Sequence, residues 1–136
     1  MLKALHISQV YVLDQEEALA FYVGKLGLKV AEDADLGYMR WLTVCVPGDE
    51  ARQIFLERPA RPAMDEKTEG QVRDLVTKGN GGGQLFFATD DCRKRYAELK
   101  AKGISFTQEP EEQPYGIDCA LRDPFGNKIR IAQTRN

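Results

Sequence analysis

The sequence of 136 residues contains a single histidine, His6. A metal site built on two or three histidines therefore cannot form within one chain, which excludes the iron site made of two histidines and one carboxylate. Any nucleophile that needs a histidine partner would have to use His6 itself. The sequence also lacks an apolar run of about 18 residues, the length of a membrane span, and it lacks the apolar core of a signal peptide. We therefore expect no membrane partner.

Cysteine content and charge exclude further classes. Cys45, Cys92 and Cys119 are odd in number, widely spaced and without a CxxC pair, which predicts reduced thiols in a cytoplasmic protein. The 19 basic and 21 acidic residues give a net charge of −2, so the chain has no electrostatic footprint for nucleic acid. With 43% hydrophobic residues it can bury the core of one domain.

The sequence contains one order of elements twice. Each half opens with an alternating strand, an acidic helix cap, a helix and a terminating glycine. In the first half these are residues 7–13, Asp14, residues 15–26 and Gly27, followed by a strand over 28–33. In the second half they are residues 84–90, Asp90 or Asp91, residues 92–102 and Gly103, followed by a strand over 104–108.

Two more strands complete each half, over 37–48 and 52–58 and then over 114–123 and 127–133. The sequence DPFGN at 123–127 suits a tight turn between antiparallel strands. Residues 59–83 are predicted to form a lid, a linker or an exchange hinge, with a short helix near 71–76. The predicted fold class is therefore α+β: βαβββ module 1 over about 1–58, a linker over about 59–83, and βαβββ module 2 over about 84–136.

Four segments of the chain together resemble the vicinal oxygen chelate superfamily, which holds glyoxalases, bleomycin-resistance proteins and extradiol dioxygenases. They are VYVLDQEEALAFYVGKLGLKV, RWLTVCVPG, FFATDDCRKRYAELKAKGISF, and PYG with RDPFGN. The resemblance implies a single domain over 1–136, in which the modules form a half-open, eight-stranded mixed barrel with helices on the convex face. It implies a ligand in the concave cavity and a homodimer, with modules that pair within or between chains.

Strand alternation predicts which side chains face that cavity, because successive residues point to opposite faces. Val10 and Val12 are expected to pack under the helix, so Ile7, Gln9 and Tyr11 would face inward. The same reasoning turns inward Gln53, Phe55, Glu57, Gln84, Phe86, Ala88, Lys128, Arg130 and Ala132. Trp41 and Thr43 would also face inward, with a core position for Trp41 as the alternative.

Metal-using members of the superfamily carry one ligand on each of four inner strands, typically histidine or glutamine, glutamate, histidine and glutamate. The resemblance places these positions at Ile7, at Gln84 and at Arg130. The remaining position is one of the inward-facing residues of the strand 52–58, which are Gln53, Phe55 and Glu57. Ile7 has no donor atom, and Arg130 carries a permanent positive charge, so we expect no bound metal. His6 lies one residue from the ligand position and faces the other way unless a bulge intervenes, which predicts a surface or interface residue.

Arg130 in an aromatic cavity would favour a carboxylate, a phosphate or a flat polar group. An ion pair between Arg130 and Glu57 is the alternative. For each aromatic residue the alternative is an ordinary core position, and Cys119 could also face the cavity without anything to activate its thiol. The candidate ligand-binding residues are Gln9, Tyr11, Trp41, Phe55, Glu57, Gln84, Phe86, Tyr115 and Arg130.

Three functions remain open at this point. The leading hypothesis is a metal-free protein that binds a small, partly aromatic or anionic molecule, as a resistance protein that sequesters its drug does. The second is a glyoxalase- or dioxygenase-type enzyme whose divalent metal is held by His6, Glu57 and Gln84. The third is a metal-free enzyme in which Glu57 or Tyr11 acts as acid or base against Arg130.

Overall fold

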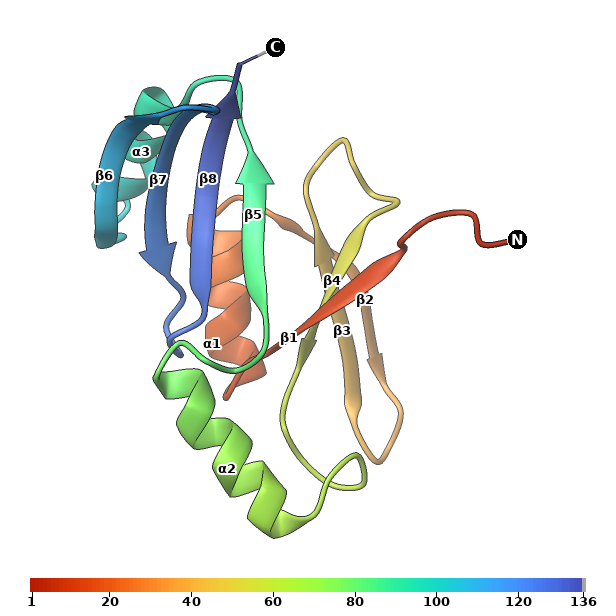
Figure 1. The fold of residues 1–136 in the computed structure, drawn as a ribbon. Coiled ribbons are helices and arrows are strands. Elements are labelled where there is room, and N and C mark those ends of the chain that lie inside the picture. The colour runs from red at the N-terminus through yellow and green to blue at the C-terminus, as the bar shows by residue number, and fades with distance from the viewer. Residues whose placement is uncertain (136) are drawn as a thin grey trace.

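The computed structural model describes residues 1–135 as two four-stranded mixed sheets with helices packed on them (Figure 1). The elements are β1 (Ile7–Tyr11), α1 (Gln15–Leu19), the π-helical segment η1 (Ala20–Lys25), β2 (Lys29–Asp35), β3 (Arg40–Cys45), β4 (Gln53–Glu57), α2 (Glu66–Thr77), β5 (Gln84–Ala88), α3 (Cys92–Ala101), β6 (Phe106–Gln113), β7 (Gly116–Arg122) and β8 (Lys128–Thr134). The sheets have the orders β1-β4-β3-β2 and β5-β8-β7-β6. The first strand of each is parallel to its neighbour and the other pairs are antiparallel. The predicted α+β fold of two βαβββ modules is confirmed, with unclosed sheets as in a half-open barrel.

The helix caps follow from the sequence. Asp14 accepts a hydrogen bond from the Glu17 amide at 2.9 Å, and Asp91, rather than Asp90, accepts one from the Lys94 amide at 3.0 Å. The first helix differs from the regular helix expected over 15–26, because it widens into η1 after Leu19. Within residues 1–135, no helix has the combined length and apolar character that crossing a membrane requires.

Strand β6 extends five residues beyond the predicted end at Gln108, and it runs through Pro110. Proline lacks an amide hydrogen and is tolerated at a sheet edge. Because β6 is the outer strand of its sheet, Pro110 does not interrupt it. The alternation of the sequence was too weak here to show the longer strand.

The core lies on one side of both sheets. The side chains predicted to face the helices are almost fully buried on four strands, namely Val10, Leu42, Val44, Leu56, Ile129 and Ile131. They form one hydrophobic cluster with Ala18 and Tyr22 of the first helical segment and Leu99 of α3. Figure 1 shows α3 lying behind the sheet of module 2. The opposite, inner faces of the sheets therefore remain outside this core.

The segment 59–83 is packed on module 2 rather than forming a free linker. It contains a twelve-residue helix, α2, which is longer than the helix predicted near 71–76. Val76 of α2 is fully buried. Gly126 in the β7–β8 turn has φ +119°, and a Cβ atom there would lie 2.5 Å from the Val76 carbonyl oxygen. Only glycine permits this close approach of the helix end to the turn.

A buried carboxylate in the same turn joins the two modules. Asp123 Oδ2 accepts hydrogen bonds from the Tyr22 hydroxyl and from Asn127 Nδ2, both at 2.7 Å. Asp123 Oδ1 accepts three backbone amides, those of residues 125, 126 and 127. Asn127 Nδ2 also donates to the Tyr11 carbonyl at 2.7 Å. Burial and the Asp123 charge raise the pKa of Tyr22, so the phenol stays protonated and keeps donating.

We predict that Tyr22→Phe lowers the free energy of unfolding by about 1–3 kcal/mol, because it removes one donor from a buried carboxylate. Urea unfolding followed by circular dichroism measures the change. Tyr38→Phe is the control, since Tyr38 is 65% exposed, and it should alter stability by no more than about 0.5 kcal/mol. Equal stability of the wild type and Tyr22→Phe would show that the bond does not hold the modules together.

Candidate functional site

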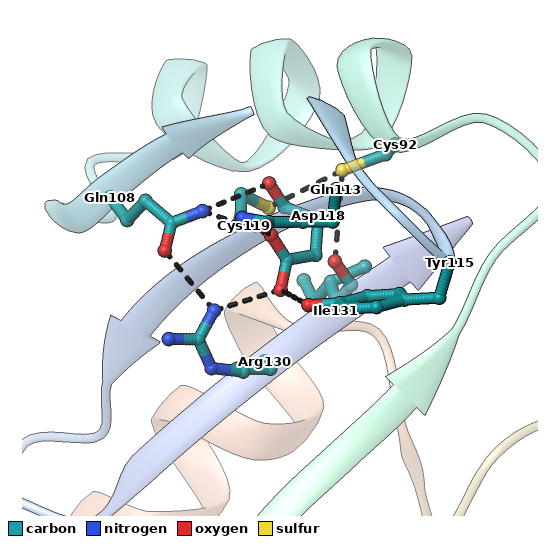
Figure 2. A network of polar contacts seen from close by, with 8 residues as sticks. All are labelled: Cys92, Gln108, Gln113, Tyr115, Asp118, Cys119, Arg130 and Ile131. Carbon is teal, nitrogen blue, oxygen red and sulfur yellow. Dashed lines mark hydrogen bonds and ion pairs between the residues drawn. The ribbon is translucent and has the colours of Figure 1, made fainter. Parts of the chain in front are cut away.

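A polar network occupies the inner face of module 2 and centres on Asp118 of β7 (Figure 2). Asp118 is only 1% exposed. Its Oδ2 accepts hydrogen bonds from the Tyr115 hydroxyl at 2.6 Å and from Arg130 Nη1 at 2.8 Å. Its Oδ1 accepts from Gln108 Nε2 at 2.9 Å and from Gln113 Nε2 at 3.3 Å. A buried charge needs such partners, and here each of them comes from a side chain on the same sheet or its β6–β7 turn.

Arg130 uses only one nitrogen in this network. Nη1 donates to Asp118 and, at 3.1 Å, to Gln108 Oε1, and Figure 2 shows both dashed lines meeting at that atom. Within residues 1–135, Nε and Nη2 have no hydrogen-bond partner. One edge of the guanidinium group therefore remains available for a ligand.

The alternative ion pair between Arg130 and Glu57 is wrong. Arg130 pairs with Asp118, which lies on the neighbouring strand β7, whereas Glu57 lies on β4 in the other sheet. The sequence analysis also missed Asp118, Gln108 and Gln113 as members of the site. The signal for Asp118 was present in the alternation of GIDCALR, where the apolar residues at 119 and 121 turn 118 inward.

The hydrogen bonds fix the charge of Asp118. Burial opposes its ionisation, but the donors Tyr115, Gln108, Gln113 and Arg130 outweigh burial and hold the pKa of Asp118 below its ordinary value. The hydrogen bond between Tyr115 and Asp118 has the opposite effect on the phenol. Together with burial and the aspartate charge, it raises the pKa of Tyr115. At neutral pH the network is thus a carboxylate beside a guanidinium, with a protonated phenol.

Two predicted aromatic residues flank the network and are open to solvent. Phe86 of β5 lies opposite Arg130 in the strand register and is 69% exposed. Tyr115 is 49% exposed. Gln84, two residues before Phe86 on the same face of β5, is also exposed. Module 2 therefore brings together four of the predicted ligand-binding residues: Gln84, Phe86, Tyr115 and Arg130.

The other predicted residues lie in module 1. Trp41 and Phe55 stack with their ring centroids 4.4 Å apart, which places Trp41 on the inner face with Phe55 rather than in the helix-side core. Phe55 is itself only 8% exposed, so Trp41 covers it. Gln9 is exposed and Tyr11 half-buried on β1. Tyr11 lies opposite Glu57, and burial, then the Glu57 charge, raises the pKa of its phenol.

Glu57 and Arg130 border different cavities. Glu57 lines a cavity of about 290 Å³ with Tyr38, Arg40, Arg58 and residues 60–63. Burial raises the pKa of its carboxyl group. Arg130 lines another, of about 230 Å³, on the inner face of module 2. These cavities do not bring together the acid–base pair of the third hypothesis.

Cys119 does not face the inner side. It points toward α3, where its Sγ lies 3.7 Å from Cys92 Sγ. Both thiols are buried and free. Burial, together with Cys92, raises the pKa of Cys119 to about 12, so it is not a nucleophile at neutral pH.

The residues at the expected metal-ligand positions do not fit a divalent ion. Ile7 offers no donor, and Arg130 is a cation already paired with Asp118. His6 precedes β1 with an exposed side chain, and only its carbonyl is engaged, by the Gln53 amide at 3.0 Å. Among residues 1–135, no three histidine, cysteine, aspartate or glutamate side chains gather as a metal site. We derive no chemical step through a metal.

This fold is that of a known class. Residues 3–131 match the model of the glyoxalase/bleomycin resistance protein/dioxygenase superfamily. The chain belongs to this superfamily, as the sequence resemblance implied.

Three relatives are similar over nearly the whole chain. The uncharacterized protein YurT of Bacillus subtilis (strain 168) is 33% identical over 93% of this chain and 96% of its own length. The crystal structure of UcmS2 superimposes with a TM-score of 0.92 and 34% identity, covering 98% of this chain and all of that one. TnmS3, an antibiotic binding protein from Streptomyces sp. CB03234, has a TM-score of 0.77 and 26% identity, with 98% of each chain covered.

The lowered pKa of Asp118 predicts an acid-dependent stability. A group whose pKa falls on folding stabilises the protein above its unfolded pKa, which is about 3.9 for aspartate, and this contribution is lost as the pH falls through the folded pKa. The stability difference between wild type and Asp118→Asn should therefore be largest near pH 6 and shrink below about pH 4. Urea unfolding between pH 2.5 and 7 measures it.

The matched control for this substitution is Asp90→Asn, because Asp90 is exposed and its side chain makes no hydrogen bond within the described chain. It removes the same charge and should leave the pH dependence of the wild type unchanged. A difference between wild type and Asp118→Asn that stays constant over the whole range would contradict the role given to the Asp118 charge.

Proposed function

We propose that the protein is a metal-free binding protein of its superfamily that holds a small, partly aromatic or anionic molecule against the inner faces of its sheets. The observation that carries this proposal is the placement of the exposed rings of Phe86 and Tyr115 beside the Asp118–Arg130 pair. Apolar rings beside a few fixed polar groups are the usual composition of a small-molecule site.

The physical reason is that the exposure of the Phe86 ring is not explained by the fold of one chain, whereas Tyr115 also donates to Asp118. An aromatic ring that is 69% exposed, as Phe86 is, gains little from folding and offers a face for stacking. The unused edge of Arg130, which lies opposite Phe86 in the strand register, adds hydrogen-bond donors on the same face of the sheet. TnmS3, which shares this fold, is an antibiotic binding protein, and this supports an antibiotic-like ligand for the present chain.

We further propose that two copies of the chain build the complete cavity. The inner-facing residues of β5 are exposed, and the cavity that Arg130 lines borders the sheet of module 2 only. The N-terminal segment 1–6 extends away from the sheets (Figure 1) and carries Leu2 and Leu5, which are 95% and 75% exposed. A second copy that covers these leucines would also close the inner faces. The three free cysteines support a place in the cytoplasm.

Titration calorimetry against a panel of aromatic antibiotics and small aromatic acids tests the binding. A ligand from the panel should bind, and Phe86→Ala should weaken it by about tenfold, because the stacking face is lost. Leu75→Ala on α2 is the control, an exposed apolar side chain away from the site. Binding that Phe86→Ala leaves unchanged would contradict the site. Near-stoichiometric metal in protein purified without chelator would favour the metalloenzyme instead.

Sedimentation equilibrium tests the second copy. We expect the mass of two chains, and we expect Leu2→Asp with Leu5→Asp to shift the protein toward one chain, since charges would replace buried apolar contacts. Leu75→Asp should leave the mass unchanged. A wild-type protein that stays monomeric at 100 times the concentration used for titration would contradict the shared cavity.

A further inference from the structure

The cavity on the inner face of module 2 is lined by three cationic side chains and by no acidic one. The cations are Arg122, Lys128 and Arg130, and the polar side chains beside them are Gln84 and Thr107. The cavity measures about 230 Å³, enough for a small acidic group and part of a ring. The stacking of an aromatic ring does not by itself explain why this cavity is lined by three cations and no carboxylate.

Arg122 and Lys128 lie directly opposite each other in the antiparallel β7–β8 register. Like charges at directly opposed positions destabilise a strand pair. Neither side chain forms an ion pair or a side-chain hydrogen bond within residues 1–135, although Lys128 is half-buried. The fold alone gives this pair no counterion.

The charge of Asp118 does not compensate the pair, because its oxygens are occupied by Arg130, Tyr115 and two glutamines. Lys78, which lies one residue before Gly79, has its own partner, since its Nζ lies 2.8 Å from Asp74. The cationic pair is therefore left uncompensated while a nearby cation is paired.

The backbone at Gly79 packs closely against the side chains of Arg122 and Lys128. Gly79 has φ +74°, and a Cβ atom there would lie 3.1 Å from both Arg122 Nη1 and Lys128 Cε. The loop after α2 thus packs on the two cations and limits their freedom to swing away. This lowers the entropy that a ligand would have to remove when it orders them.

We propose that Lys128 and Arg122 bind an anionic oxygen group of the ligand, a carboxylate, sulfonate or phosphate, while its aromatic ring lies on Phe86. Gln84, the register partner of Lys128, is two residues from Phe86 on β5, a spacing of about 7 Å, which fits an acidic group attached directly to a ring. The ligand class is therefore an aromatic acid. This inference rests on the proposed function for the position of the ring.

Two fluorescent dyes of the same ring system separate the acidic group from the ring. The first, 8-anilinonaphthalene-1-sulfonate, carries a sulfonate, and the second, N-phenyl-1-naphthylamine, carries none. We expect wild-type protein to bind the sulfonate dye about tenfold more tightly, because charge-assisted contacts add to stacking. Raising NaCl from 50 mM to 500 mM should reduce this preference, since exposed charges are screened.

Lys128→Gln and Arg122→Gln should each lower the affinity for the sulfonate dye by about fivefold to tenfold and leave the affinity for the neutral dye unchanged. Lys94→Gln is the control with the same change of net charge, on the exposed side of α3. A cooperative thermal transition in each variant shows that the dye reports a folded protein and not a molten one.

The outcomes distinguish this inference from the proposed function. Equal affinity for the two dyes, or a preference that both glutamine variants retain, would overturn the anionic subsite and leave the aromatic site intact. Failure of the neutral dye to bind, with sulfonate binding that Lys128→Gln abolishes, would keep the subsite and count against the aromatic face. Failure of both dyes would overturn both.

Discussion

The structure depends on the buried carboxylate of Asp123. Five hydrogen bonds end on its two oxygens, three from backbone amides of its own turn, one from Asn127 and one from Tyr22, which lies 101 residues away in the sequence. A buried carboxylate without these donors would be strongly destabilising, so the turn and the first helical segment must adopt their positions together. The turn at residues 123–127 therefore connects the two modules and also reverses the chain direction between β7 and β8. It also receives the end of α2 at Gly126.

This connection has a consequence for function. It connects the modules through their helix sides, where the apolar cluster is continuous. The inner-face side chains of module 2, such as Phe86 and Arg130, lie outside that cluster. On module 2 the inner-face side chains form a polar network flanked by exposed aromatic rings, a composition that is not typical of a hydrophobic core.

The fold could be predicted well from the sequence, because helix caps and strand alternation depend on residues that are close together along the chain. Asp14 and Asp91 cap their helices, and Ile129 and Ile131 alternate with Lys128 and Arg130, so caps and faces could be predicted from spacing alone. The site was harder to predict, since it depends on which strands become neighbours. Arg130 was placed on the correct face, but its partner, Asp118, lies on the adjacent strand and not on β4, where Glu57 is. Neither the length of α2 nor the π-helical geometry of η1 was predicted from the spacing of residues in the sequence.

The protonation states of the network favour binding over acid–base chemistry. The pKa of Asp118 lies below its ordinary value and that of Tyr115 above its ordinary value, so neither group exchanges a proton near pH 7. A guanidinium group is not a general base in proteins, so the arginine of the network supplies donors only. Catalytic acids and bases need pKa values near the working pH, and in this network the hydrogen bonds move those values in the opposite direction. Burial raises the pKa of Glu57, but Glu57 lies in the other module, in a cavity that Arg130 does not line. This arrangement of fixed charges and hydrogen-bond donors therefore supports the proposed binding function.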